Sequence, residues 1–99
     1  MKRIIRRFEF DVEITPEGLA DIKDIDIIYE IIHGIFYGIA SGSETVDLFE
    51  IKTLDNNQMF SISRKKWIKA LDKCMNAMIE IEDYETCQEI KKALNILSY

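Results

Sequence analysis

The residues suited by type to do chemistry are few and scattered in this sequence. Its one histidine, His33, follows Glu30 in the spacing Glu-x-x-His, which carboxylate-rich metal sites use. Such sites need two copies of the motif and two further carboxylates, and the chain has no second copy. We therefore interpret Glu30, His33 and Tyr37 as the wetter edge of a buried helix, and we predict neither a metal site nor a cofactor.

The candidate nucleophiles also lack the context that catalysis requires. Ser41 and Ser43 lie in "GIASGS", which is neither a Gly-x-Ser-x-Gly elbow nor a glycine-rich phosphate loop. The two cysteines, Cys74 and Cys87, form no Cys-x-x-Cys pair, so we expect free, buried thiols too far apart for a disulfide. The sequence predicts that the protein is not an enzyme.

A group of basic residues is the most unusual chemical feature. Arg64, Lys65, Lys66 and Lys69 come at the start of a predicted helix, where the helix dipole disfavours cations. Acidic neighbours in the fold, ordinary solvation or an external anion could offset that cost, so these four residues are a candidate anion or nucleic-acid patch. The formal net charge of the 99 residues is -5, which argues against indiscriminate nucleic-acid binding.

The elements that must position these residues begin with a strand and a helix. Strict alternation from Phe8 to Ile14 predicts a strand with Phe8, Phe10, Val12 and Ile14 inward. Thr15-Pro16 predicts a short helix start, and a main isoleucine-rich helix follows from Asp24 or Asp26 to Ala40. Its glycines, Gly34 and Gly38, suggest close approach of another backbone. It is too short and too polar for a membrane span.

The pattern of residues after position 45 predicts two strands and two helices. Residues 46–54 and 59–62 read as strands joined by a tight turn at 55–58. Two helical stripes follow, and Asp83 is placed to cap the second helix. The stripes consist of Trp67, Leu71, Cys74, Met78 and Ile81, and then of Tyr84, Cys87, Ile90, Leu94 and Leu97.

Two consecutive helices with so short a connection should fold antiparallel. The sequence therefore predicts a single α+β domain over residues 1–99, in the order β-α-β-β-α-α. Residues 1–62 would form a three-stranded, mainly antiparallel sheet with one isoleucine-rich helix, and residues 63–99 an antiparallel helical hairpin.

Residues 75–97 carry a family resemblance. The second half of the UVR motif reads Phe-Glu-x-Ala-Ala-x-Leu-Arg-Asp-x-Ile, and residues 84–94 here read Tyr-Glu-Thr-Cys-Gln-Glu-Ile-Lys-Lys-Ala-Leu. Met75 matches the methionine of the motif's first helix, whereas Lys91 and Lys92 replace its Arg-Asp pair. This stretch resembles the helical hairpin found in bacterial excision-repair proteins and in several adaptors. The resemblance implies a protein-binding hairpin, unless these positions simply complete the domain's own core.

The leading functional interpretation is a small cytoplasmic adaptor or inhibitor that docks a larger protein. The predicted contacts are Tyr84, Glu85, Gln88, Lys91 and Lys92, aided by a bipolar charge distribution. Eighteen isoleucines are typical of an AT-rich genome, such as a low-GC bacterium or one of its phages. Acidic residues soon after the basic N-terminus argue against a signal peptide.

Two alternatives remain open. A nucleic-acid accessory protein would use Lys2, Arg3, Arg6 and Arg7 together with Arg64, Lys65 and Lys66, with Trp67 stacking on a base. Self-association through the isoleucine-rich helix would instead give a homodimer.

Overall fold

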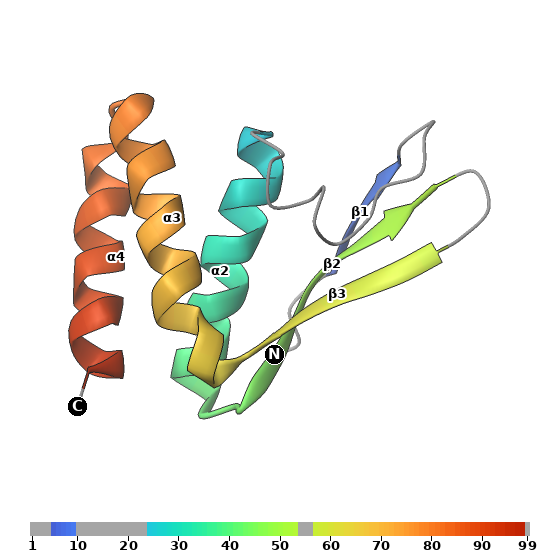
Figure 1. Ribbon diagram of the computed structural model, residues 1–99, viewed down its shortest axis with the longest axis horizontal. Helices are drawn as coiled ribbons and strands as arrows, with labels where there is room; N and C mark the ends of the chain where they lie inside the picture. The colour runs from blue at the N-terminus through green and yellow to red at the C-terminus, as the bar shows by residue number, and fades with distance from the viewer. Residues whose placement is uncertain (1–4, 10–23, 54–56, 99) are drawn as a thin grey trace.

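A computed structural model describes residues 5–9, 24–53 and 57–98 (Figure 1). The element order β-α-β-β-α-α is confirmed. A single 3-10 turn, Arg64–Lys66, leads directly into the first helix of the hairpin. The bounds are β1 Arg6–Glu9, α2 Ile25–Ser41, β2 Thr45–Lys52, β3 Asn57–Ser63, α3 Trp67–Glu80 and α4 Tyr84–Leu97.

The three strands form a mixed sheet in the order β1-β2-β3. β2 and β3 pair antiparallel, from Thr45 opposite Ser63 to Lys52 opposite Asn57, as predicted for a hairpin. β1 pairs parallel to β2, with Arg6 opposite Phe49, because the chain passes through α2 before returning to the sheet. Phe8 is half-buried and packs edge to face on Phe49 at 5.6 Å between ring centroids. Several predictions lie outside the described residues: inward-facing Phe10, Val12 and Ile14, the helix start at Thr15-Pro16, and positions 55 and 56 of the predicted turn. The other two turn positions, Asn57 and Gln58, belong to β3 instead.

A β-bulge in β2 changes which residues face the core. Asp47 pairs with Ser61 and Phe49 with Phe60, so two residues of β2 oppose one of β3. The extra residue shifts the alternation by one position. Val46 and Leu48 are therefore buried before the bulge, while Phe49 and Ile51 are buried after it.

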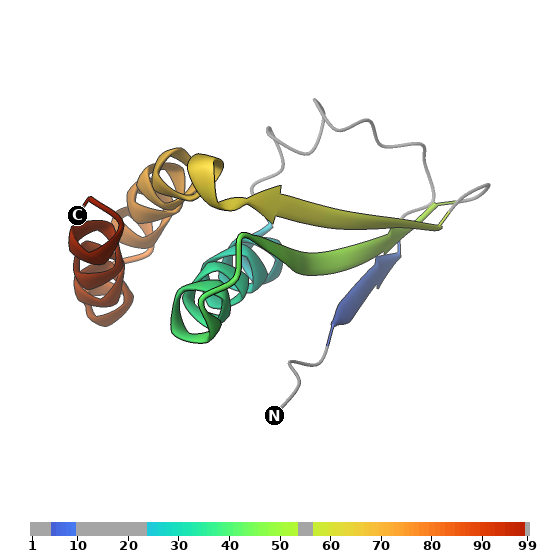
Figure 2. The same ribbon diagram turned by 90° about the horizontal axis from the view of Figure 1, so that it is seen from below.

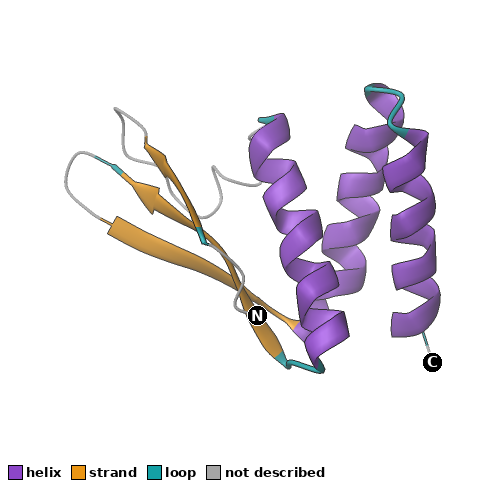
Figure 3. Cartoon of the chain, turned by 180° about the vertical axis from the view of Figure 1, so that it is seen from behind, coloured by secondary structure: helices purple, strands orange, loops and turns teal. Residues whose placement is uncertain are grey.

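The helix α2 lies between the sheet and the helical hairpin (Figures 1 and 2). α3 runs antiparallel to both α2 and α4, so α2 and α4 run in the same direction (Figure 3). Isoleucines of α2 meet the apolar stripes of the sheet and of the hairpin in one cluster. The fully buried large side chains of that cluster are Ile32, Ile35, Trp67, Leu71, Met78 and Ile90.

Both ends of α2 are capped. Asp24 accepts hydrogen bonds from the backbone amides of Asp26 and Ile27, at 2.9 and 3.3 Å. At the other end Gly42 adopts φ 69°, and Ser43 N donates to Gly38 O at 3.0 Å. Glycine tolerates this left-handed conformation without strain, and the helix ends at Ser41, one residue beyond the predicted end at Ala40.

The prediction that another backbone approaches Gly38 is wrong, because side chains make the close contact there. A Cβ there would lie 2.5 Å from Val46 Cγ1 and 2.7 Å from Trp67 Cη2. The buried indole fills the space that the glycine leaves, and its Nε1 donates to Ile62 O at 3.1 Å. The glycine thus lets α2 pack directly on β2 and on the start of α3.

The C-terminal hairpin is confirmed. Glu82 takes the left-handed position at φ 60°, and the amides of Glu82 and Asp83 donate to Ile79 O and Met78 O at 3.0 and 2.9 Å. This Schellman pattern ends α3, and Asp83 begins α4 by accepting from Thr86 N at 3.2 Å. The stripe prediction was wrong at its ends, because the turn directs Ile81 and Tyr84 into solvent, where they are 46% and 58% exposed.

Candidate protein-docking surface

The predicted docking residues of α4 are all exposed: Tyr84, Glu85, Gln88, Lys91 and Lys92. Cys87, Ile90 and Ala93 are buried in the core on the opposite side of the helix. At 100° per residue, the five residues fall on the half of α4 that faces away from this buried stripe. The structure therefore uses one side of α4 for the fold and leaves the other free for contact.

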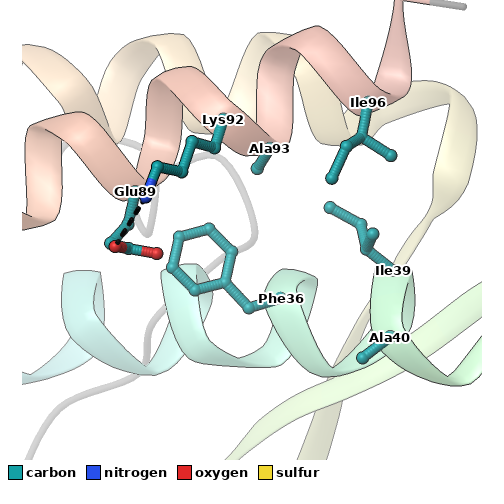
Figure 4. Close-up of a pocket in the computed structure, with 7 residues that line it drawn as sticks. All are labelled: Phe36, Ile39, Ala40, Glu89, Lys92, Ala93 and Ile96. Carbon is teal, nitrogen blue, oxygen red and sulfur yellow. Dashed lines mark ion pairs between the residues drawn. The ribbon is translucent and has the colours of Figure 1, made fainter.

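An open apolar groove of about 400 Å³ runs between α2 and α4 (Figure 4). Of the predicted docking residues only Lys92 lines it, and its Nζ pairs with Glu89 Oε1 at 3.7 Å on the rim. Ile96 projects toward Ile39 and remains 54% exposed. The full lining is Phe36, Ile39, Ala40, Glu89, Lys92, Ala93 and Ile96.

The sequence did not predict this groove, because Phe36 and Ile39 belong to the apolar set of α2, and periodicity alone does not divide that set between the core and the surface. A signal was present nevertheless. Residues 31–43 contain no Asp, Glu, Lys or Arg in a chain that is 31% charged, yet His33, Tyr37 and Ala40 are exposed. A solvent-facing helix normally carries charges on its outer side. Depletion of charge on an exposed surface is typical of the centre of a protein interface.

A polar contact ties α2 to the hairpin turn beside this surface. Tyr29 Oη donates a hydrogen bond to Asp83 Oδ2, and Thr86 Oγ1 donates to the same oxygen at 2.7 Å. The bond from Tyr29, followed by those from Thr86, lowers the pKa of Asp83 below its ordinary value. The same bond to Asp83, with burial and the carboxylate charge, raises the pKa of Tyr29. The turn is thereby held against α2.

The predicted anion patch divides into an exposed part and an anchored part. Lys65, Lys66 and Lys69 are exposed, whereas Arg64 is half-buried with its guanidinium 5.3 Å from the Trp67 ring centroid. In the described part of the chain no carboxylate lies within 4.0 Å of these four cations. Each cation near a helix N-terminus costs about 0.3–1 kcal/mol, and no ion pair within the described segments offsets that cost.

The structure bears on two parts of the nucleic-acid alternative, namely the role of Trp67 and the availability of Arg6 and Arg7. The proposed stacking of Trp67 on a base is wrong, because the indole is fully buried. Arg6 pairs with Asp26 and Glu30 at 3.8 and 3.9 Å, and Arg7 pairs with Glu50 at 3.5 Å. Those two arginines are therefore partly engaged within the fold, unlike the lysines at the start of α3.

The candidates for catalysis and metal binding do not converge in the described residues. Glu30 faces Arg6, while His33 is exposed and lies 6.0 Å from the Tyr29 ring. Within residues 5–9, 24–53 and 57–98, no three His, Cys, Asp or Glu side chains group as metal ligands would. Ser41 and Ser43 share a hydrogen bond at 2.8 Å. Both cysteines are free and buried, and burial raises the pKa of Cys74 to about 11.

Comparison with protein-family models, with curated proteins and with solved structures gave no match. Among the described helices, none is both long and apolar enough to cross a membrane.

Proposed function

We propose that this protein is a small cytoplasmic adaptor or inhibitor that binds a larger protein, and that its role is binding and not catalysis. The contact surface is the exposed side of α4, with Tyr84, Glu85, Gln88, Lys91 and Lys92, together with the groove that α4 shares with α2. The UVR-like pattern of residues 75–97 is consistent with such a role.

The proposal depends on the wall of the groove that α2 provides. This wall consists of Phe36, Ile39 and Ala40, and it lies within residues 31–43, which contain no Asp, Glu, Lys or Arg. The groove offers apolar side chains from both helices, and its two charged lining residues neutralise each other. Charge complementarity therefore favours an occupant that is itself uncharged and apolar at the point of contact. We assign the groove to an aliphatic or aromatic anchor of the partner protein, surrounded by polar contacts to the exposed side of α4.

Photo-crosslinking tests the assignment. A photoreactive amino acid at position 96, in the full chain expressed in its source cell, should crosslink to one partner protein, which is then purified. Ile96→Asp should weaken binding of that partner by at least about tenfold, because it places a charge in the apolar groove. Met59→Asp on β3 is the matched control, since Met59 is 45% exposed and remote from the groove in sequence and sheet position.

Equal weakening by both substitutions would refute the groove as the contact site. Crosslinks to a second copy of the chain would replace the adaptor with a homodimer, which sedimentation at several concentrations would then show.

The nucleic-acid alternative rests on the exposed lysines at the start of α3. Salt-dependent binding of DNA or RNA that disappears on replacing Arg64, Lys65 and Lys66 by Ala would support it.

A further inference from the structure

The exposed side of α3 carries a basic stripe. Lys65, Lys69 and Lys73 recur every four residues through the 3-10 turn and α3, and Lys66 lies beside them. All four lysines are exposed, and the stripe extends over about 12 Å at the rise of an α-helix. Asp72 is the single acidic residue between positions 64 and 79.

An apolar stripe runs next to the lysines on the same helix. Ile68 and Ile79 are 41% and 50% exposed, and the half-buried Met75 lies between them. These residues are spaced i, i+7 and i+11, which places them in one row along a helix. Lys65 precedes Ile68 by three residues, so the two stripes are adjacent. The core takes other residues of α3, namely Trp67, Leu71, Cys74 and Met78.

We infer that this side of α3 docks an acidic amphipathic helix of a partner protein. The partner's apolar side chains would cover Ile68, Met75 and Ile79, and its Asp or Glu residues at four-residue spacing would reach Lys65, Lys69 and Lys73. Apolar seams flanked by complementary charges are how helices choose partners in coiled coils and helix-in-groove complexes.

The pairing of the two stripes favours a helix over a nucleic acid. Phosphates would engage the lysines but would leave the exposed isoleucines without a role, and the nearby indole of Trp67 is buried. Because this surface lies on α3, the inference does not rest on the groove between α2 and α4, and either proposal can fail alone.

Selection from a displayed library of helical peptides against the full chain tests the inference. We expect the enriched peptides to combine an apolar row with acidic residues four apart. Their affinity should fall at least about tenfold in the triple variant Lys65→Glu, Lys69→Glu and Lys73→Glu, and also in Ile68→Ser with Ile79→Ser. Lys52→Glu is the control and should leave the affinity unchanged, because Lys52 is exposed at the end of β2 and lies opposite Asn57, at the end of β3 away from α3.

Thermal unfolding of each variant, followed by circular dichroism, separates loss of contact from loss of fold. Absence of acidic peptides from the enriched set, or acidic-peptide binding that survives the triple charge reversal, would overturn the inference. So would lysine-dependent, salt-sensitive binding of single-stranded or duplex DNA without dependence on Ile68 and Ile79, since that result assigns the stripe to a nucleic acid.

Discussion

The hydroxyl of Tyr29 in α2 donates to the carboxylate of Asp83 at the hairpin turn, 54 residues further along the chain. Asp83 also accepts from the backbone and the side chain of Thr86, so one carboxylate both begins α4 and attaches the turn to α2. Replacement of Asp83 should therefore affect more than a helix cap.

Asp83→Ala should lower the free energy of unfolding by about 1–2 kcal/mol, because it removes the N-cap of α4 as well as the bond from Tyr29. Tyr29→Phe removes only the bond and should cost about 0.5–1.5 kcal/mol. Urea unfolding of both variants and of the double variant measures the coupling between the two residues. Fully additive effects would show that the bond contributes nothing to stability.

The same carboxylate should give the stability a pH dependence in acid. The folded protein lowers the pKa of Asp83, so it binds this proton less readily than the unfolded chain does. The stability that the Asp83 carboxylate adds is present above the ordinary carboxyl pKa. It is lost as the pH falls through the lower pKa that Asp83 has in the folded protein. Urea unfolding between pH 7 and acid should show a smaller acid loss in Tyr29→Phe than in the parent chain. Identical pH profiles would contradict this origin.

Glu82→Gly should stabilise the protein. Glu82 occupies the left-handed position of the Schellman turn at φ 60°, a conformation that costs a residue with a Cβ about 1 kcal/mol. Lys73→Gly, at an exposed position in the interior of α3, is the control and should destabilise by about 0.5–1 kcal/mol. The melting temperatures of the two variants should move in opposite directions, and a shared decrease would refute this account of the turn.

Gly38→Ala should destabilise the fold, although alanine is the better helix former. The added methyl would meet Val46 and the buried Trp67 ring, and overpacking of this kind costs about 1–3 kcal/mol. His33→Ala on the exposed side of the same helix should have little effect. An unchanged or raised melting temperature for Gly38→Ala would show that the indole can move aside.

Lys65→Glu should raise stability by about 0.3–1 kcal/mol, because an anion at the start of α3 suits the helix dipole. Lys73→Glu, two turns further on, should gain less. Urea unfolding at low and high salt measures both effects, which should shrink as salt screens the charges. A loss of stability in Lys65→Glu would indicate that the lysine has a structural role in the fold.

Local patterns were sufficient to predict α2, the β2–β3 hairpin, the C-terminal helical hairpin and the cap of α4 at Asp83. They did not predict the direction of β1, because alternation around Phe8 reports which face is buried and not which way a neighbouring strand runs. The bulge was visible as adjacent apolar residues, Leu48 and Phe49, that interrupt the alternation of β2. The absence of charge from residues 31–43 was a signal of an exposed apolar surface, but the groove itself was not predicted, because its two walls come from α2 and α4, which are distant in sequence.

The buried thiols give the protein an internal reporter. Cys74 in α3 and Cys87 in α4 are both buried in the core cluster and share no disulfide, and burial keeps Cys74 protonated well above neutral pH. A thiol in that state reacts with an alkylating reagent only when the helices separate. The alkylation rate of the wild-type chain would therefore measure how often the hairpin opens. A bound partner that holds the hairpin closed would lower this rate, and no cysteine would have to be introduced for the measurement.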